Sequence, residues 1–221
     1  MLKAIIFDFD GVICESSEIK TEAFRRLFSQ YPRHRKEIIA YHERNGGISR
    51  FVKFKVIYRD ILKKKLTAEQ TRYLGKKFAQ YSLQAVLKAG YVKGAIPFFK
   101  KYHKELFLFI VSGTPQAEMR LIAKNRQLTK FFKGVFGSPR TKKELIAQIL
   151  RQNKLKKEEV IFVGDSINDY EGAKEIGVAF IGRLHKNMAN PFVGEKNIKG
   201  FISDFSDLNA ILQQEFSLHY K

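Results

Sequence analysis

Residues 4–12 of the chain read AIIFDFDGV, and this stretch is the most informative one for the fold. The apolar run at residues 4–7 is typical of a strand that is buried on both faces. Asp8 and Asp10 follow it directly, so two carboxylates are expected where the strand passes into a loop, and ligands bind at this end of strands in open α/β sheets. A pair of buried like charges is costly, and a divalent cation that prefers hard oxygen ligands, such as Mg²⁺, would offset the cost. The alternative is a strand end that carries two solvated aspartates.

A second apolar strand is predicted in the segment 107–115, which reads FLFIVSGTP. It ends in Ser112, and Thr114 followed by Pro115 has the pattern of a helix N-cap and first turn. A helix N-terminus presents free N–H groups and the positive end of the helix dipole, which favour a phosphate. The alternative for Ser112 is an ordinary turn serine.

Two more segments add charged side chains in a similar way. In residues 137–144, GSPRTKKE, Thr141 and Glu144 have the spacing of a capping box, which places Lys142 in the first helical turn. A cation there opposes the helix dipole, so a bound anion would explain it, although Lys142 could also be a solvated charge. Lys143 is its rival, about 100° away around the helix.

The last of these segments is residues 160–169, VIFVGDSIND, in which an apolar strand leads to Asp165. Asp169 follows one helical turn later. The alternative for Asp169 is the acidic half of a capping box with Ser166.

The order of these motifs along one chain resembles that of the haloacid dehalogenase superfamily, in the subfamily of phosphoglycolate phosphatase and β-phosphoglucomutase. The resemblance covers residues 1–14 and about 93–205. It implies an α/β fold, with a Rossmann-like parallel sheet flanked by helices and an inserted all-helical cap domain. The expected catalytic core is residues 1–14 and 93–221, and the expected cap is residues 15–92.

The apolar pattern along the chain agrees with that division, because strands and helices alternate outside the cap and only helices are expected inside it. The expected strands are residues 2–8, 106–112, 134–137, 160–164, 178–181 and 200–203. The expected core helices are near residues 95–103, 115–126, 142–153, 167–176 and 206–215. Within the cap, helices are expected from residue 32 to about 44 and, after a capping box at Thr67 and Gln70, to about residue 88.

The resemblance also implies a mechanism, the hydrolysis of a small phosphate monoester through an aspartyl-phosphate. Asp8 would be the nucleophile, and Asp10 would protonate the leaving group and then activate water. The residues expected to hold the phosphoryl oxygens are Ser112, Gly113, Thr114 and Lys142. The residues expected to hold Mg²⁺ are Asp8, Asp10 (through its backbone carbonyl), Asp165 and Asp169, the last directly or through a water.

The expected cap offers one indication of the substrate. Residues 46–50, GGISR, resemble a cap loop of β-phosphoglucomutase, in which the arginine holds a second phosphate. Ser49 and Arg50 are therefore candidate substrate-binding residues, and the alternative for Arg50 is a solvated helix start.

Other activities on the same fold stay open to different degrees. Lys20 stands where the mutase has a histidine, which puts mutase activity in doubt. Arg50 stands where phosphonoacetaldehyde hydrolase has its Schiff-base lysine, and a guanidinium cannot form that imine, although Lys53 and Lys55 lie nearby. Asp10 argues against haloacid dehalogenation, whose enzymes lack this second aspartate. An inactive phosphate-binding regulator is the non-enzymatic alternative.

Composition limits the partners. The 221 residues carry a formal net charge of +19, and residues 15–92 alone hold 18 Lys/Arg against 7 Asp/Glu. A basic cap would attract anionic substrates, whereas no recognisable nucleic-acid-binding motif accompanies the charge. A small phosphorylated metabolite is the expected partner, nucleic acid and membrane are not, and the oligomeric state stays open. The single Cys14 and the lack of an apolar leader lead us to expect a cytoplasmic protein.

Overall fold

The computed structural model describes residues 1–186 and 188–216 and contains a six-stranded sheet. All pairings are parallel, in the order β3-β2-β1-β4-β5-β6. This arrangement confirms the expected α/β fold and places β1 beside both β2 and β4. The strands are β1 (Ala4–Phe7), β2 (Phe107–Pro115), β3 (Gly134–Ser138), β4 (Val160–Gly164), β5 (Ala179–Arg183) and β6 (Ile198–Ile202).

Both faces of the sheet are apolar, as the uninterrupted hydrophobic run in β1 predicts. Successive side chains of a strand point to opposite faces, and here Ile5 and Phe7 join one buried cluster while Ala4 and Ile6 join another. Helices α5, α6 and α9 supply the partners on the first face, and α7 and α8 those on the second. The core is therefore a three-layer sandwich. Its helices are α5 (Ala95–Tyr102), α6 (Gln116–Asn125), α7 (Lys142–Asn153), α8 (Ile167–Ile176) and α9 (Phe205–Glu215), with a short 3₁₀ turn η3 (Lys157–Glu159).

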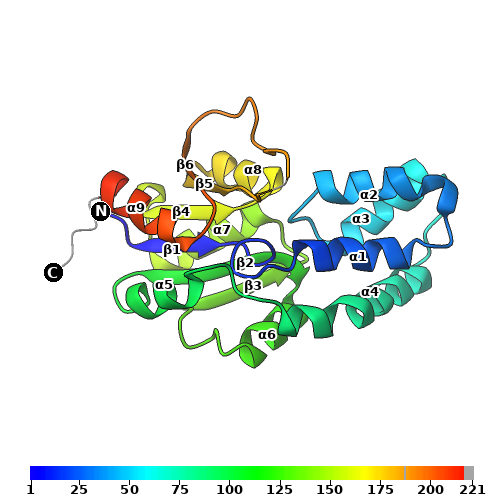
Figure 1. The fold of residues 1–221 in the computed structure, drawn as a ribbon, viewed down its shortest axis with the longest axis horizontal. Coiled ribbons are helices and arrows are strands. Elements are labelled where there is room, and N and C mark those ends of the chain that lie inside the picture. The colour runs from blue at the N-terminus through cyan, green and yellow to red at the C-terminus, as the bar shows by residue number, and fades with distance from the viewer. Residues whose placement is uncertain (187, 217–221) are drawn as a thin grey trace.

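The chain between β1 and α5 is helical and projects from the carboxyl ends of the strands (Figure 1). Its helices enclose a hydrophobic cluster of their own, which includes Phe24, Phe28, Phe54 and Phe78. A separate core of this kind supports the predicted cap, and we call the segment 15–92 the predicted cap below. Its elements are α1 (Ser17–Leu27), η1 (Pro32–His34), α2 (Arg35–Arg44), α3 (Arg50–Val56), a π-helical turn η2 (Ile57–Ile61) and α4 (Ala68–Lys88).

The two connections between the sandwich and the predicted cap run side by side. Cys14 forms an antiparallel bridge with Tyr91, and the Val92 N–H donates to the carbonyl of Ile13 at 3.0 Å. The buried Cys14 packs here, and burial raises its pKa to about 11, so the thiol is protonated at neutral pH. The pairing lies close to the predicted boundaries at residues 14 and 93, which stay a prediction.

One sequence expectation about the elements is wrong. Strand β2 extends to Pro115 and α6 begins at Gln116, so Thr114 does not cap the helix. Thr114 belongs to the last part of a strand whose register with β3 shifts between Val111 and Pro115. Its side chain is consequently free to bond elsewhere, as described below.

We also examined the helices for membrane segments. In the described part of the chain, every helix is too short or too polar to cross a bilayer.

Candidate active site

A cavity of about 600 Å³ lies between the carboxyl ends of the strands and the predicted cap. The sandwich contributes Asp8, Asp10 and Asp165, which follow their strands, and Ser112, which lies in the second half of β2. The predicted cap closes the other side with residues of α1, α2, α3 and α4. Because β1, β2 and β4 are neighbours, residues more than 150 positions apart in sequence meet at one edge of the sheet.

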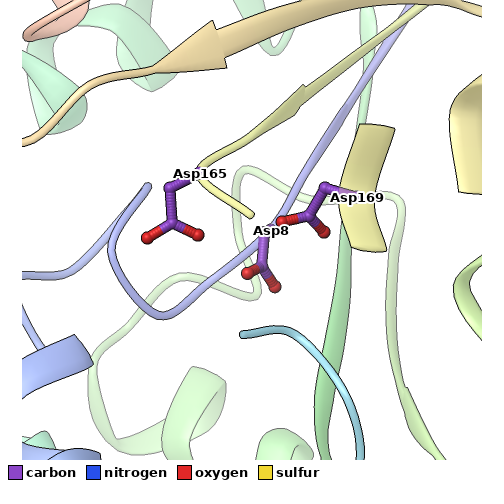
Figure 2. Close-up of side chains that lie close together, drawn as sticks. All are labelled: Asp8, Asp165 and Asp169. Atoms are coloured by element: carbon purple, nitrogen blue, oxygen red, sulfur yellow. The ribbon is translucent and has the colours of Figure 1, made fainter. Parts of the chain in front are cut away.

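Three carboxylates form the centre of this edge. Asp8 follows β1, Asp165 follows β4 and Asp169 lies in the first turn of α8, and one oxygen or more of each lies within 4.8 Å of the others. The three side chains converge in Figure 2. Burial, opposed by Lys142, and the charges of Asp169 and Asp165 raise the pKa of Asp8 well above its usual range. The cluster therefore needs additional positive charge to keep Asp8 ionised.

Lys142 supplies part of that charge. Its Nζ lies 2.8 Å from Oδ1 of Asp8 and donates to Oδ1 of Asp169. Burial alone would lower the pKa of Lys142, but Asp169 and Asp8 raise it above its ordinary value, so it is a cation. The predicted capping box of Thr141 and Glu144 is present and places Lys142 in the first turn of α7.

Lys143 has a different environment. It is exposed and pairs with Glu175 of α8 at 2.6 Å. Of the two neighbouring lysines, only Lys142 lies beside Asp8.

The capping-box interpretation of Asp169 is confirmed, and its role at a metal stays a prediction. Its Oδ2 accepts from the N–H and the hydroxyl of Ser166, which completes a capping box for α8, while its Oδ1 accepts from Lys142. Neither Asp169 nor Lys142 lines the cavity itself. Both charges contribute to the electrostatic environment of Asp8.

Asp10 faces the cavity beside Asp8, held by three contacts. Oδ1 accepts from Ser16 Oγ at 2.6 Å, and Oδ2 accepts from Thr114 Oγ1 at 3.3 Å. The Nζ of Lys20 lies 3.7 Å from Oδ2. Thr114 therefore fixes the orientation of Asp10 rather than capping a helix.

Ser112 and Gly113 end the regular part of β2 at the cavity. The Ser112 hydroxyl accepts from the N–H of Thr114 at 3.1 Å, which orients its oxygen toward the turn. A β-carbon on Gly113 would collide with the backbone carbonyl of Gly47, which comes from the predicted cap. Glycine at 113 is thus required by the close approach of the two parts of the chain.

The loop at residues 46–50 reaches the edge of the sheet at the carboxyl ends of the strands. Asn168 donates to the carbonyl of Gly46 at 2.8 Å, and Arg50 pairs with Glu118 of α6 at 2.5 Å. The Arg50 side chain is 4% exposed, so the solvated-helix alternative for it is wrong. Arg50 lines the cavity, whereas Ser49 is the N-cap of α3 and is not part of the lining.

Among the residues of the site that were not expected from sequence are a histidine and a glutamate. His185 Nε2 lies 2.8 Å from Asp165 Oδ2, and Glu118 is the partner of Arg50. The signal for His185 is its position just after β5, the neighbour of β4. Glu118 carries no local signal, because only the docking of the predicted cap onto α6 gives it a role.

The donor set fits a hard divalent cation. In the described residues, Asp8 Oδ1 is a buried oxygen that has no hydrogen bond of good geometry, although the Lys142 ammonium is close. Lys142 contacts two of the three carboxylates, Asp8 and Asp169. All the candidate ligand atoms are oxygens, which is the chemistry that Mg²⁺ prefers.

Comparisons with known proteins agree with this geometry. A family model described as haloacid dehalogenase-like hydrolase matches residues 5–183. A Thermotoga maritima protein named "Phosphorylated carbohydrates phosphatase" is 27% identical over 191 residues, which are 83% of this chain and 86% of that protein.

Two solved structures share the fold. A hydrolase from Pseudomonas syringae has a TM-score of 0.79 at 19% identity, covering 96% of this chain and 99% of the other. A predicted phosphoglycolate phosphatase from Haemophilus somnus has a TM-score of 0.74 at 19% identity, covering 96% and 98%.

Proposed function

The chain belongs to the haloacid dehalogenase-like hydrolase family, and we propose that it is a Mg²⁺-dependent phosphatase that acts on a small phosphate monoester. The observation that carries this proposal is the convergence of Asp8, Asp165 and Asp169 beside Lys142. Asp8 and Asp165 line one cavity together with Asp10. A nucleophile, an acid–base group and a surplus of carboxylate oxygens are the groups that phosphoryl transfer requires. The phosphatase name of the Thermotoga maritima relative supports the same assignment.

The proposed reaction uses the residues of the chain in two steps. An oxygen of Asp8 attacks phosphorus, and the bond from phosphorus to the leaving oxygen breaks while Asp10 gives that oxygen a proton. Asp10 then takes a proton from water, whose oxygen attacks the phosphorus of the aspartyl-phosphate. The bond from phosphorus to the Asp8 oxygen breaks, which releases phosphate and restores the Asp8 carboxylate. Ser112, the N–H of Gly113 and Lys142 would stabilise the phosphoryl oxygens during both steps.

We further propose that Asp8, Asp165 and the backbone carbonyl of Asp10 hold Mg²⁺. When bound, Mg²⁺ would neutralise charge on the phosphoryl group and on the carboxylates. Both oxygens of Asp169 already accept hydrogen bonds, which favours a role for it through a water rather than as a direct ligand.

The substrate is proposed to be a sugar phosphate or a phosphoglycolate-like ester. The cavity of about 600 Å³ suits a small metabolite, and it is lined by both carboxylates and cations. Substrate binding by Thr114, Ser49 and Arg50 stays a prediction: Thr114 and Arg50 line the cavity and Ser49 does not.

The test of this proposal compares Asp8→Asn with Asp60→Asn, an exposed aspartate of η2. Asp8→Asn should abolish hydrolysis of an aryl phosphate, and excess chelator should abolish it in the unmodified protein, while Asp60→Asn should keep full activity. Calorimetry with Mg²⁺ alone should show binding that is weakened in Asp165→Asn. Substantial turnover by Asp8→Asn, or full activity in chelator, would contradict the mechanism.

A further inference from the structure

The cavity wall that the predicted cap contributes contains a buried lysine for which the proposed mechanism has no role. Lys53 lies on α3, is 3% exposed and lines the cavity. Its Nζ donates to the carbonyl of His42 at 3.0 Å and lies 3.1 Å from His42 Nδ1. An ammonium has three N–H donors, so one of them has no partner in the part of the chain that the structure describes.

His42 is suited to hold this ammonium. Burial, together with Lys53, Lys20 and Arg25, lowers the pKa of His42 to about 2, so its imidazole is neutral. In the tautomer protonated at Nε2, Nδ1 accepts a hydrogen bond from Lys53. The ring of His42 packs on Phe24, with ring centres 4.0 Å apart, which fixes its position.

Lys53 differs from the other buried or half-buried cations that line the cavity, because those cations have carboxylates nearby. Arg50 is neutralised by Glu118, and Lys20 lies 3.7 Å from Asp10 and 4.0 Å from Glu118. Within the described residues, Lys53 has no carboxylate within 4.0 Å. The wall thus carries one buried ammonium without an anionic partner.

Such an ammonium is expensive to keep charged. Burial lowers the pKa of Lys53 to about 7. The charge of Asp10 opposes this shift, and the charge of Lys20 adds to it. An anion bound beside Lys53 would raise this pKa again, because the ammonium and the anion would attract each other strongly in a region of low dielectric. Phe24 and Phe78 also line the cavity and keep that part of it apolar.

We propose that Lys53, positioned by His42, binds a second anionic group on the leaving part of the substrate. The preferred substrate is then a phosphate monoester whose leaving group carries a carboxylate or another phosphate, rather than a neutral sugar alcohol. This inference rests on the proposed function, because it takes the reacting phosphate to lie at Asp8. The sheet side of the cavity would hold that phosphate, and the wall of the predicted cap would hold the second anion.

The test uses pairs of substrates that differ in the second charge. In one pair, 3-phosphoglycerate is compared with glycerol 3-phosphate, and in the other glucose 1,6-bisphosphate is compared with glucose 6-phosphate. The unmodified protein should favour the charged member of a pair in kcat/KM by about tenfold or more, the scale of one charge-assisted contact. The two pairs distinguish a carboxylate from a second phosphate as the natural group.

Two variants on one helix make the comparison specific. Lys53→Met should lower the ratio of kcat/KM between charged and neutral members by about ten- to hundredfold, through KM rather than kcat. Lys55→Met, at an exposed position of the same helix, should leave that ratio unchanged. Equal losses on both members in Lys53→Met would indicate a structural role for the lysine and overturn the proposal.

Binding measured without turnover separates this proposal from the proposed function. In an Asp8→Asn background, calorimetry should give tighter binding of 3-phosphoglycerate, or of the bisphosphate, than of the neutral partner, and Lys53→Met should remove the difference. If an aryl phosphate is hydrolysed but neither pair is discriminated, the anion site fails alone; if nothing is hydrolysed, the proposed function fails. Borohydride trapping of phosphonoacetaldehyde on Lys53 would assign the amine to imine chemistry and would also overturn the proposal.

Discussion

At the scale of single residues, the structure separates side chains that are neighbours in the sequence. Lys142 and Lys143 occupy consecutive positions in the first turn of α7, yet one is buried between Asp8 and Asp169 and the other pairs with Glu175 in solvent. A surface ion pair contributes little, whereas a charge held against the reacting carboxylate acts where charge develops. The consequences of removing each lysine should differ accordingly.

Lys142→Ala should lower kcat/KM by about 10²–10³, the effect of losing one preorganised contact to a transition-state charge. Lys143→Ala is the matched control and should be nearly silent. Steady-state kinetics on one phosphate ester gives both numbers, with melting curves to establish that each variant is folded. A larger loss of kcat/KM in Lys143→Ala than in Lys142→Ala would contradict this assignment and give the role to Lys143.

The effect of replacing Asp10, unlike that of replacing Asp8, should depend on the leaving group of the substrate. Asp10→Asn should lower turnover of an alkyl phosphate by about 10²–10⁴, the usual contribution of a general acid and base. An aryl phosphate, whose leaving group needs little protonation, should still react with Asp8 and give a burst of phenolate, because Asp10 is also missing for hydrolysis of the intermediate. Equal losses on both substrates without a burst would argue against this role.

At the scale of elements, the contact between α3 and α6 joins the predicted cap to the sandwich. Arg50 and Glu118 are both largely buried in this contact, and the Arg50 guanidinium also lies 4.4 Å from the centre of the Phe78 ring. Asn168 and the carbonyl of Gly46 make a second contact of this kind. Caps that close over a site exclude water during reaction, and we expect these contacts to stabilise the closed arrangement of the predicted cap.

Arg50→Gln and Glu118→Gln should each raise KM by roughly ten- to hundredfold, since each leaves a buried charge without its partner. If the pair acts by holding α3 on α6, the double variant should be no worse than the more severe single one, and all substrates should be affected alike. If Arg50 instead binds the substrate, only Arg50→Gln should raise KM, and only for esters with a distal anionic group. A double-mutant cycle on an aryl phosphate and on a bisphosphate decides between the two.

At the scale of the whole molecule, the buried pair of Lys53 and His42 couples stability to pH. Burial, partly offset by Asp10, lowers the pKa of Lys53 to about 7, so above pH 7 and up to about 10.5 the unfolded chain binds more protons at this site than the folded chain. Its contribution to the free energy of unfolding therefore rises with pH in that window. His42, with its pKa lowered by burial to about 2, makes stability fall as the pH drops below about 6.5.

Urea denaturation of the full chain at pH 5, 7 and 9 measures this coupling. The difference in the free energy of unfolding between Lys53→Met and the unmodified protein should favour the variant at pH 7 and shrink at pH 9, because Met removes an uncompensated buried charge. The change should approach about 1.4 kcal/mol for each pH unit above 7. Lys55→Met should show no such dependence, and a pH-independent difference for Lys53→Met would mean that its amine is not titrating there.

The sequence by itself was sufficient for the sandwich and for the positions of the motifs on it. The apolar run before Asp8 and those before Ser112 and Asp165 form neighbouring strands, and the capping boxes at Thr141 and Ser166 start their helices where predicted. These features depend on local patterning and on the handedness of parallel crossovers, which leave few alternatives. The strand extension at Thr114 was not predicted, because a threonine hydroxyl can either cap a helix or bond to another side chain. Here the hydroxyl donates a hydrogen bond to Asp10.

Only the tertiary structure decided which charges compensate one another. Glu118 neutralises Arg50, His185 approaches Asp165, and Lys53 is left with a neutral histidine as its partner. No spacing along the chain encodes these pairs, since each depends on how the predicted cap docks or how a loop folds over the sheet. The free energy of a charge is set by burial and by everything within a few ångströms of it, and that information exists only once distant segments are brought together.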